Sequence, residues 1–232
     1  MGALTRIGWW RAARILFCVT VGMAGLGGVA QAAVVSSWTL AKDASDSVDG
    51  NTGTAQNVVF TGSEAVFNGT TSRITVPYNP NLSPGAADVT ASVQVNTTYM
   101  PGTKGFDFDL IRSSPTGKMY KVELFPHGGK AQAQCIFHGS VNGTATRITL
   151  HKGPSLNDGV WHTITCTKTA NQVTLTIATN DAVIGTWTAA IQIGTIKNRK
   201  NSVFALGYKP VPGGTDGDFL HGQMRNATVS IG

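Results

Sequence analysis

The chain has 232 residues, of which 41% are hydrophobic and 13% are charged. Its formal net charge of +6 comes from 18 Lys and Arg residues against 12 Asp and Glu residues. Three of the arginines lie in an N-terminal segment that we expect to be removed, which leaves fifteen basic and twelve acidic residues and a net charge of +3. This weak charge, without a dense run of Lys or Arg, argues against a nucleic-acid partner.

Residues 1–32 have the three parts of a secretory signal peptide. Arg6, Arg11 and Arg14 form a basic start, residues 15–29 form an apolar run, and Ala30-Gln31-Ala32 is an A-x-A cleavage site. The apolar run is shorter than the roughly 20 residues that a membrane-spanning helix needs. We therefore expect cleavage after Ala32, a secreted, extracellular chain of residues 33–232, and no membrane insertion afterwards.

The remainder of the chain is a series of short segments rich in Val, Ile, Thr and aromatic residues. Clusters of Gly, Asn, Pro and Asp separate these segments, and no window shows a convincing helical period. Regular short strands predict an all-β fold, a two-sheet antiparallel jelly-roll sandwich in one domain. The expected strands are 36–41, 57–61, 64–68, 73–76, 89–98, 106–112, 120–125, 131–137, 146–150, 161–167, 173–178, 184–187, 202–207 and 222–231.

Two of these strands alternate between apolar and charged residues. Asp107 and Asp109 fall on one face of their strand, and Lys121 and Glu123 on one face of theirs. Such alternation is typical of an antiparallel sheet with one face in solvent, so we expect these four charges to be solvated. The apolar residues expected to face the core are Phe106, Phe108, Leu110, Tyr120, Val122 and Leu124.

The segment 156–168 combines a turn, an aromatic residue and a strand. Asn157-Asp158-Gly159 is a turn signal, because Asn and Asp tolerate a left-handed backbone and Gly has no Cβ. After the turn, Trp161 and Thr163 fall on one face, and His162, Ile164 and Cys166 on the other. This unit resembles the central "DGxWHTV" hairpin of laminin G-like domains, in which the histidine looks structural.

Further segments extend this resemblance over most of the chain. Residues 65–69 and 72–77, then 109–112 and 120–124, and finally 219–224 are similar to successive laminin G-like strands in the family's order. The resemblance implies a secreted bacterial member of the concanavalin A-like lectin/glucanase superfamily. Two departures stand out: residues 179–182 replace a usual V-D-G turn, and Arg225 replaces an acid that often follows the last strand motif.

Cys135 and Cys166 are the two cysteines outside the N-terminal segment, which contains Cys18. Each lies on an expected strand and shares a face with apolar residues, and export permits a disulfide. The resemblance implies that these strands are neighbours, since such bacterial domains often carry a cysteine in each. We therefore predict a Cys135–Cys166 bridge, with two buried free thiols as the alternative.

The sequence lacks the usual motifs of a hydrolase. Glycosidases mostly need two carboxyl groups that flank the scissile bond, and the E-x-D-x-E strand of the superfamily's glucanases is missing. Only Glu64 and Glu123 are glutamates, and Asp107-Phe108-Asp109 is explained by strand alternation. The five histidines have no H-E-x-x-H spacing. We expect no enzymatic activity and no catalytic residues.

The resemblance raises the question of Ca²⁺, because related domains often bind it at the rim of the sandwich through oxygen ligands. Residues 43–51 form an acidic, turn-rich loop similar to a calcium loop of some relatives. The expected ligands are Asp46, Asp49 and Asp218, and the alternative is a pair of solvated turns. Arg225 stands where relatives often have an acid, which weighs against the metal.

On this basis we predict a secreted, monomeric, non-catalytic binding module for a glycan or an extracellular protein, which Ca²⁺, if bound, would assist. Tyr99 and Tyr208 lie in expected rim loops and are candidate platforms for a sugar ring, although packed tyrosines are the commoner case. A glycoside hydrolase on the same fold and a structural protein of the cell envelope are the alternatives.

Overall fold

Fifteen β-strands and one short 3₁₀ turn form two antiparallel sheets in the computed structural model, which describes residues 32–102, 107–180 and 182–232. The predicted signal peptide lies outside the described residues apart from Ala32. Within the described ranges, no helix is both long enough and apolar enough to cross a bilayer.

One layer, which we call sheet A, has eight strands. Its long strands come from the second half of the chain, together with β6 from the first half. Strand β15 lies at its centre and pairs with β6, β4 and β1. In order across the sheet, the strands are β13 (Ala182–Ala190), β12 (Gln172–Thr179), β11 (His162–Lys168), β6 (Val89–Asn96), β15 (His221–Ile231), β4 (Ala65–Asn68) and β3 (Val59–Phe60), with β1 (Ala33–Trp38) against β15.

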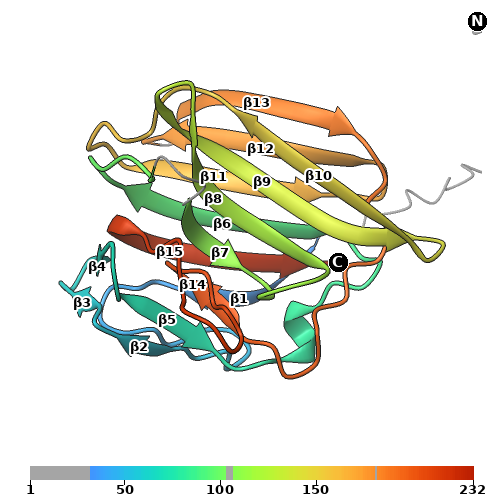
Figure 1. Ribbon diagram of the computed structural model, residues 1–232, viewed down its shortest axis with the longest axis horizontal. Helices are drawn as coiled ribbons and strands as arrows, with labels where there is room; N and C mark the ends of the chain where they lie inside the picture. Colours follow the sequence, from blue (N-terminus) through green and yellow to red (C-terminus); the bar gives the residue numbers. More distant parts are fainter. Residues whose placement is uncertain (1–31, 103–106, 181) are drawn as a thin grey trace, which may run out of the picture. The chain divides into compact units, whose positions relative to one another are not determined.

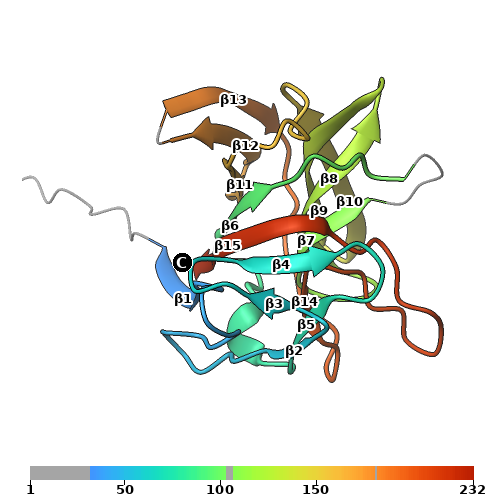
Figure 2. The ribbon, with the colours of Figure 1, turned by 90° about the vertical axis from the view of Figure 1, so that its left-hand side faces the viewer.

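The other layer, sheet B, has seven strands, and Figure 1 shows its long strands crossing over those of sheet A. The two layers are seen from the side in Figure 2. In order across sheet B, the strands are β10 (Thr144–Lys152), β9 (Lys130–Val141), β8 (Met119–His127), β7 (Phe108–Arg112), β14 (Phe204–Leu206), β5 (Arg73–Val76) and β2 (Thr54–Gln56). The 3₁₀ turn η1 (Pro80–Leu82) follows β5.

The core lies between the two sheets and is built from the alternate residues that the sequence pattern predicted to face inward. In β11, His162, Ile164 and Cys166 are buried while the residues between them are partly exposed. The same alternation runs through β6 and β12. The predicted all-β, two-sheet antiparallel sandwich is therefore confirmed, because period-two burial on facing strands leaves one dry interior.

Two tight turns explain why β8, β9 and β10 of sheet B are longer than predicted. Gly128 and Gly129 join β8 to β9, and Asn142 and Gly143 join β9 to β10, all four at positive φ. Positive φ at both central residues is the requirement of a two-residue type I′ hairpin. The hairpins carry the pairing of β8, β9 and β10 up to the turns.

One predicted strand divides between the two sheets. The expected strand 57–61 is replaced by β2 in sheet B and β3 in sheet A. Asn57 lies between them with φ at +55°. A left-handed residue interrupts an extended chain, so the segment turns from one layer to the other at this point.

The predicted Cys135–Cys166 disulfide is confirmed, with the two Cα atoms 5.6 Å apart. The expectation that the bridged strands are neighbours is wrong, because β9 belongs to sheet B and β11 to sheet A. The bond therefore crosses the core and joins the layers. Closing a loop with a sequence separation of 31 stabilises the fold by about 3–4 kcal/mol in the chain-entropy treatment.

Candidate functional site

A groove with a volume of about 390 Å³ lies where β4 and β6 end and β15 begins. Sheet pairing brings its walls together: Asn96 lies opposite Gln223 across β6 and β15, and Asn68 lies opposite His221 across β4 and β15. The loop after β6 adds Thr98 to the lining of the groove, together with Tyr99. The site is thus assembled from three segments that are far apart in the sequence.

Short polar contacts hold the loop after β6 against β15. The hydroxyl of Thr97 donates to the backbone carbonyl of His221 over 2.6 Å and accepts from the backbone N–H of Tyr99 over 2.9 Å. Gly222 permits this approach, because a Cβ there would lie 2.6 Å from the carbonyl oxygen of Asn96. The position of Tyr99 is therefore set by the backbone of β15.

Tyr99 presents an aromatic surface to this groove. Its side chain is 48% exposed, and its ring stacks on that of His221 with an angle of 12° between the planes. Burial lowers the pKa of His221, so its imidazole is neutral at neutral pH. The sequence predicted Tyr99 as a sugar platform, which stays a prediction, and did not point to His221 beneath it.

The remaining groups in the groove are neutral hydrogen-bonding side chains. Asn96 uses its amide nitrogen to donate to the carbonyl of Gly159 over 3.0 Å, which turns its oxygen outward as an acceptor. Among the described residues, nothing pairs with the amide of Gln223 or the hydroxyl of Tyr99. An aromatic face with unpaired amides and hydroxyls matches the surface of a neutral sugar, which has an apolar side and a rim of hydroxyls.

Tyr208, the second predicted sugar platform, does not fit that role. Its side chain is 3% exposed, and its hydroxyl is bonded to the hydroxyl of Thr75 over 2.7 Å. Its ring stacks on Phe219. The prediction for Tyr208 is therefore wrong, because the loop after β14 turns this side chain against the protein.

The residues predicted to hold Ca²⁺ are not brought together as a ligand set. Asp46 accepts four backbone N–H groups, through Oδ1 from Ser37 and Val48 and through Oδ2 from Asp49 and Asn51, at 2.8–3.2 Å. Burial would raise the pKa of Asp46, but these four hydrogen bonds outweigh it and hold the pKa below its ordinary value.

Asp46 therefore has a structural role, because its carboxylate binds the backbone of the turn that follows it. Four donors occupy the lone-pair positions that a carboxylate offers, which leaves little capacity for a cation. Asp49 accepts from the amide of Asn81 over 3.2 Å. Asp218 lies instead beside Asp107 and Asp109 on sheet B. Calcium binding stays a prediction, and these residues do not fit it.

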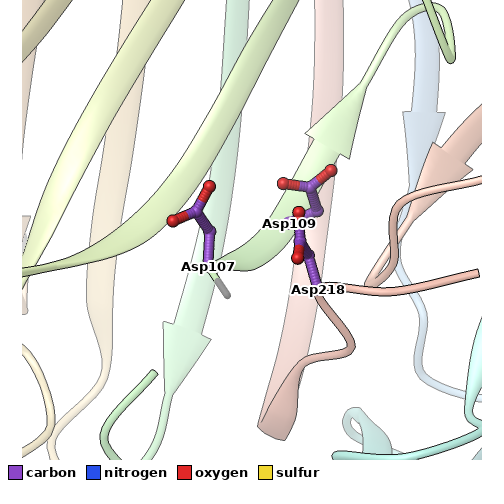
Figure 3. A group of neighbouring side chains, drawn as sticks. All are labelled: Asp107, Asp109 and Asp218. Atoms are coloured by element: carbon purple, nitrogen blue, oxygen red, sulfur yellow. The ribbon is translucent and has the colours of Figure 1, made fainter. Parts of the chain in front are cut away.

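Asp107, Asp109 and Asp218 gather on the outer face of sheet B, with carboxylate oxygens within 4.8 Å of one another (Figure 3). The ammonium of Lys121 lies among them, 2.5 Å from Asp109 and 3.4 Å from Asp107, and also pairs with Glu123. The lysine thus supplies the cation for this acidic group from within the chain.

The prediction that these charges are solvated is wrong. Asp109 and Glu123 are fully buried, and Lys121 is nearly so. The backbone N–H of Asp109 donates to the carbonyl of Asp218 over 3.0 Å, and Lys209 pairs with Asp218 over 3.0 Å. The segment before β15 therefore lies beside β7 and adds the carboxylate of Asp218 to this charged group.

A β-bulge in β7 completes this arrangement. In a regular strand, residues three apart point to opposite faces. The register shifts between Asp109 and Ile111, which returns Arg112 to the face of Asp109, and their side chains pair over 3.1 Å. In the sequence, the bulge is indicated only by the three-residue spacing of Asp109 and Arg112, which a regular strand would place on opposite faces.

The buried charges influence one another strongly. Burial raises the pKa of Glu123 well above its ordinary value, although Lys121 opposes the effect. Burial and then Asp109 raise the pKa of Asp218. For Lys121, burial acts to lower the pKa, but the carboxylates of Asp109 and Glu123 outweigh it and hold the pKa above its usual range. These charged side chains are together called the ion network: Asp107, Asp109, Arg112, Lys121, Glu123, Lys209 and Asp218.

The histidine of the turn–Trp–strand unit has the structural role that the sequence predicted. One ring nitrogen of His162 lies 2.9 Å from the carboxylate of Asp158, and the other lies 2.9 Å from the hydroxyl of Thr179. Gly159 has φ at +75°, as the turn requires. Arg225 lies over the ring of Trp161 at 4.1 Å.

No known protein family matches this chain, and no curated protein matches its sequence. Solved structures do resemble it. One is domain 4 of AbnA, a GH43 extracellular arabinanase from Geobacillus stearothermophilus, in complex with arabinotriose. The TM-score is 0.52 at 18% identity, over 87% of this chain and 94% of that domain.

The receptor-binding domain of botulinum neurotoxin mosaic serotype C/D also matches, with a TM-score of 0.54 at 13% identity over 85% of this chain. The chain spans 47%, about half, of that protein. Domains LG4-5 of the mouse laminin alpha1 chain give a TM-score of 0.49 at 19% identity, over 79% of this chain and 43% of that one. At such identities, the arabinanase and toxin likenesses show a shared β-sandwich fold.

Proposed function

We propose that the protein is an exported, non-catalytic binding module that recognises a neutral glycan through the groove around Tyr99. One observation carries the proposal: an exposed tyrosine ring, stacked on His221, lines the same groove as the neutral amides of Asn96 and Gln223. The proposal of export rests on the signal-peptide pattern of residues 1–32.

The physical case depends on complementarity. A pyranose ring has an apolar face of C–H groups, which packs on an aromatic ring, and equatorial hydroxyls, which need hydrogen-bond partners when desolvated. The volume of about 390 Å³ lies within the range of small-ligand pockets. Because β15 and β4 hold the stacked rings in place before binding, little conformational entropy is lost on association.

The shared fold is compatible with this role. The arabinanase domain of similar fold was solved with arabinotriose, so a sandwich of this kind can hold a short neutral oligosaccharide. At 18% identity, the likeness assigns no residue of this chain to a sugar. The Tyr99 groove is proposed from its own chemistry.

The non-catalytic part of the proposal rests on the state of the buried carboxylates. A glycosidase presents two carboxyl groups to the scissile bond. Glu123 is fully buried and is bonded to Gln134 and Lys121, so its carboxyl is already engaged by the protein. Asp109 is similarly paired with Arg112 and Lys121.

The decisive experiment is a glycan-array screen of the purified protein beside its Tyr99→Ala variant, run with Ca²⁺ and again with EDTA. We expect binding to neutral glycans that Tyr99→Ala weakens about tenfold, the size of a lost aromatic contact. Tyr99→Phe keeps the stack and loses only the hydroxyl, so it should bind more tightly than the alanine variant. Binding lost in EDTA would restore a role for the metal.

A matched control is Tyr78→Ala, which removes another partly exposed tyrosine outside the groove. Equal loss in both variants, or full binding without Tyr99, would show that the groove is not the site. Array binding to no glycan would reject the glycan proposal and turn the search to an extracellular protein partner or a structural envelope role.

A further inference from the structure

A second cavity, of about 230 Å³, lies on the outer face of sheet B above the ion network. It is separate from the Tyr99 groove and has no lining residue in common with it. Basic side chains dominate its wall. The charged and imidazole groups that line it are Asp107, Arg112, Lys121, His138, Arg147 and Lys209.

The basic groups differ in how far the protein already satisfies them. Arg112 pairs with Asp109, Lys121 with three carboxylates, and Lys209 with Asp218. Arg147 has no ion-pair partner in the described part of the chain. It stands on β10 directly opposite His138 of β9, and both line the cavity. Within the described residues, this cavity therefore contains a guanidinium without an ion-pair partner, that of Arg147, beside the imidazole of His138.

The same cavity also contains an unsatisfied acceptor. Oδ1 of Asp107 is buried and has no hydrogen-bond partner among the residues that the structure describes, while Oδ2 of the same residue faces Lys121 at 3.4 Å. A buried carboxylate oxygen without a donor is unfavourable unless a ligand or water supplies one. A ligand that fits this cavity would therefore place an anionic group on Arg147 and a hydrogen-bond donor on Asp107.

We propose that this cavity binds a hydroxylated carboxylate of the uronic-acid class, with its carboxylate on Arg147 and a ring hydroxyl donating to Asp107. A simple anion would satisfy Arg147 but would be repelled by Asp107. A metal cation would meet Arg112, Lys121 and Lys209. A neutral sugar would leave the guanidinium unpaired, and the small volume suits a single ring.

The test is calorimetric titration of the purified protein with glucuronate. Glucose is the matched ring without the carboxylate, and acetate is the matched carboxylate without hydroxyls. We expect glucuronate to bind at least about tenfold more tightly than either, because charge-assisted hydrogen bonds are the stronger kind. Added salt should weaken glucuronate binding and leave neutral-glycan binding in the Tyr99 groove unchanged.

Arg147→Ala is the informative variant, because this exposed side chain has no partner to lose and the fold should keep its melting temperature. It should remove the preference for glucuronate. Lys130→Ala deletes one exposed charge near the start of β9, about 26 Å along the strand from His138, and should leave the preference intact. Asp107→Asn should weaken glucuronate but not acetate.

A uronate-terminated disaccharide separates two sources of the same chemistry. If the disaccharide and glucuronate both bind, the ligand is the end of a glycan chain. If only glucuronate binds, the ligand is a free sugar acid. Equal affinities for glucuronate, glucose and acetate would overturn the proposal, as would unchanged binding in Arg147→Ala or no saturable heat at millimolar glucuronate. Tyr99→Ala should not affect this titration, so the two proposed sites can fail independently.

Discussion

The outer faces of the two sheets differ in chemistry although both inner faces are apolar. On sheet A, hydroxyl side chains oppose one another from strand to strand, as Thr90 does Thr167 over 3.1 Å and Ser92 does Thr165 over 2.8 Å. Thr174 and Thr188 continue one of these rows over 3.2 Å. These side chains are partly exposed, so water can replace any contact that is lost.

On sheet B, the corresponding positions carry the buried ion network. Asp109, Glu123 and Gln134 lie opposite one another on β7, β8 and β9, as the hydroxyls do on sheet A. Here, however, Asp109 and Glu123 are fully buried, and the bulge in β7 and the segment before β15 bring Arg112 and Asp218 to them. The comparison teaches that the period-two pattern sets which face a residue is on, whereas distant segments decide whether that face is wet.

The comparison is tested most strongly at Lys121. Lys121→Met leaves the buried Glu123 without its cation and Asp109 with Arg112 alone, and removing one partner of a buried pair costs about 3–5 kcal/mol. Urea unfolding followed by circular dichroism measures this loss of stability. Lys130→Met, on the exposed end of β9, should change stability by about 0.5 kcal/mol or less. Similar values for the two variants would mean that the network is solvated after all.

An intermediate effect that depends on pH is expected at Glu123. Its pKa in the folded protein is raised by burial, whereas in the unfolded chain it stays near 4.5. As the pH rises above that value, the unfolded state releases its proton first, so this group lowers the free energy of unfolding through the window up to the folded pKa. Glu123→Gln lacks this contribution.

The stability of Glu123→Gln relative to the native chain should therefore increase as the pH rises from about 4.5. Unfolding free energies measured from about pH 2 to about pH 8 test this sign and include the acidic window of the control variant. Asp46→Asn is the opposite control, because the pKa of Asp46 is lowered: its stabilising contribution is present above the ordinary value of 3.8 and is lost as the pH falls through the folded pKa. Parallel pH profiles for the two variants would contradict the comparison.

The smallest effect is expected on the outer face of sheet A. Thr165→Val keeps the shape and the β-propensity of the side chain and loses one cross-strand hydrogen bond to Ser92. Such pairs contribute about 0.2–1 kcal/mol, so the midpoint of urea unfolding should move only slightly. A loss as large as that of Lys121→Met would show that this face is as constrained as sheet B.

The sequence by itself determined the strands and the inner face, because alternation, turn residues and cysteines are local signals. Val173, Leu175 and Ile177 are buried as their spacing predicts, and the turn at Gly159 and the disulfide pairing are as expected. Tyr99 is exposed in a loop after β6, as expected, and its role as a sugar platform stays a prediction. The strands and the turn follow from chain geometry over a few residues, whereas the disulfide was predicted from the export signal and the family resemblance.

Only the tertiary structure decided which outward side chains are buried and what surrounds them. Asp218 accepts a backbone hydrogen bond from Asp109, more than a hundred residues earlier in the sequence, and a single register shift returns Arg112 to the face of Asp109. Tyr208 packs inward, and His221 lies under Tyr99, for the same reason: each contact joins segments that are distant in the chain. Alternation carries no information about such contacts, so the cavity beside Arg147 was invisible until the two sheets and their connecting segments were in place.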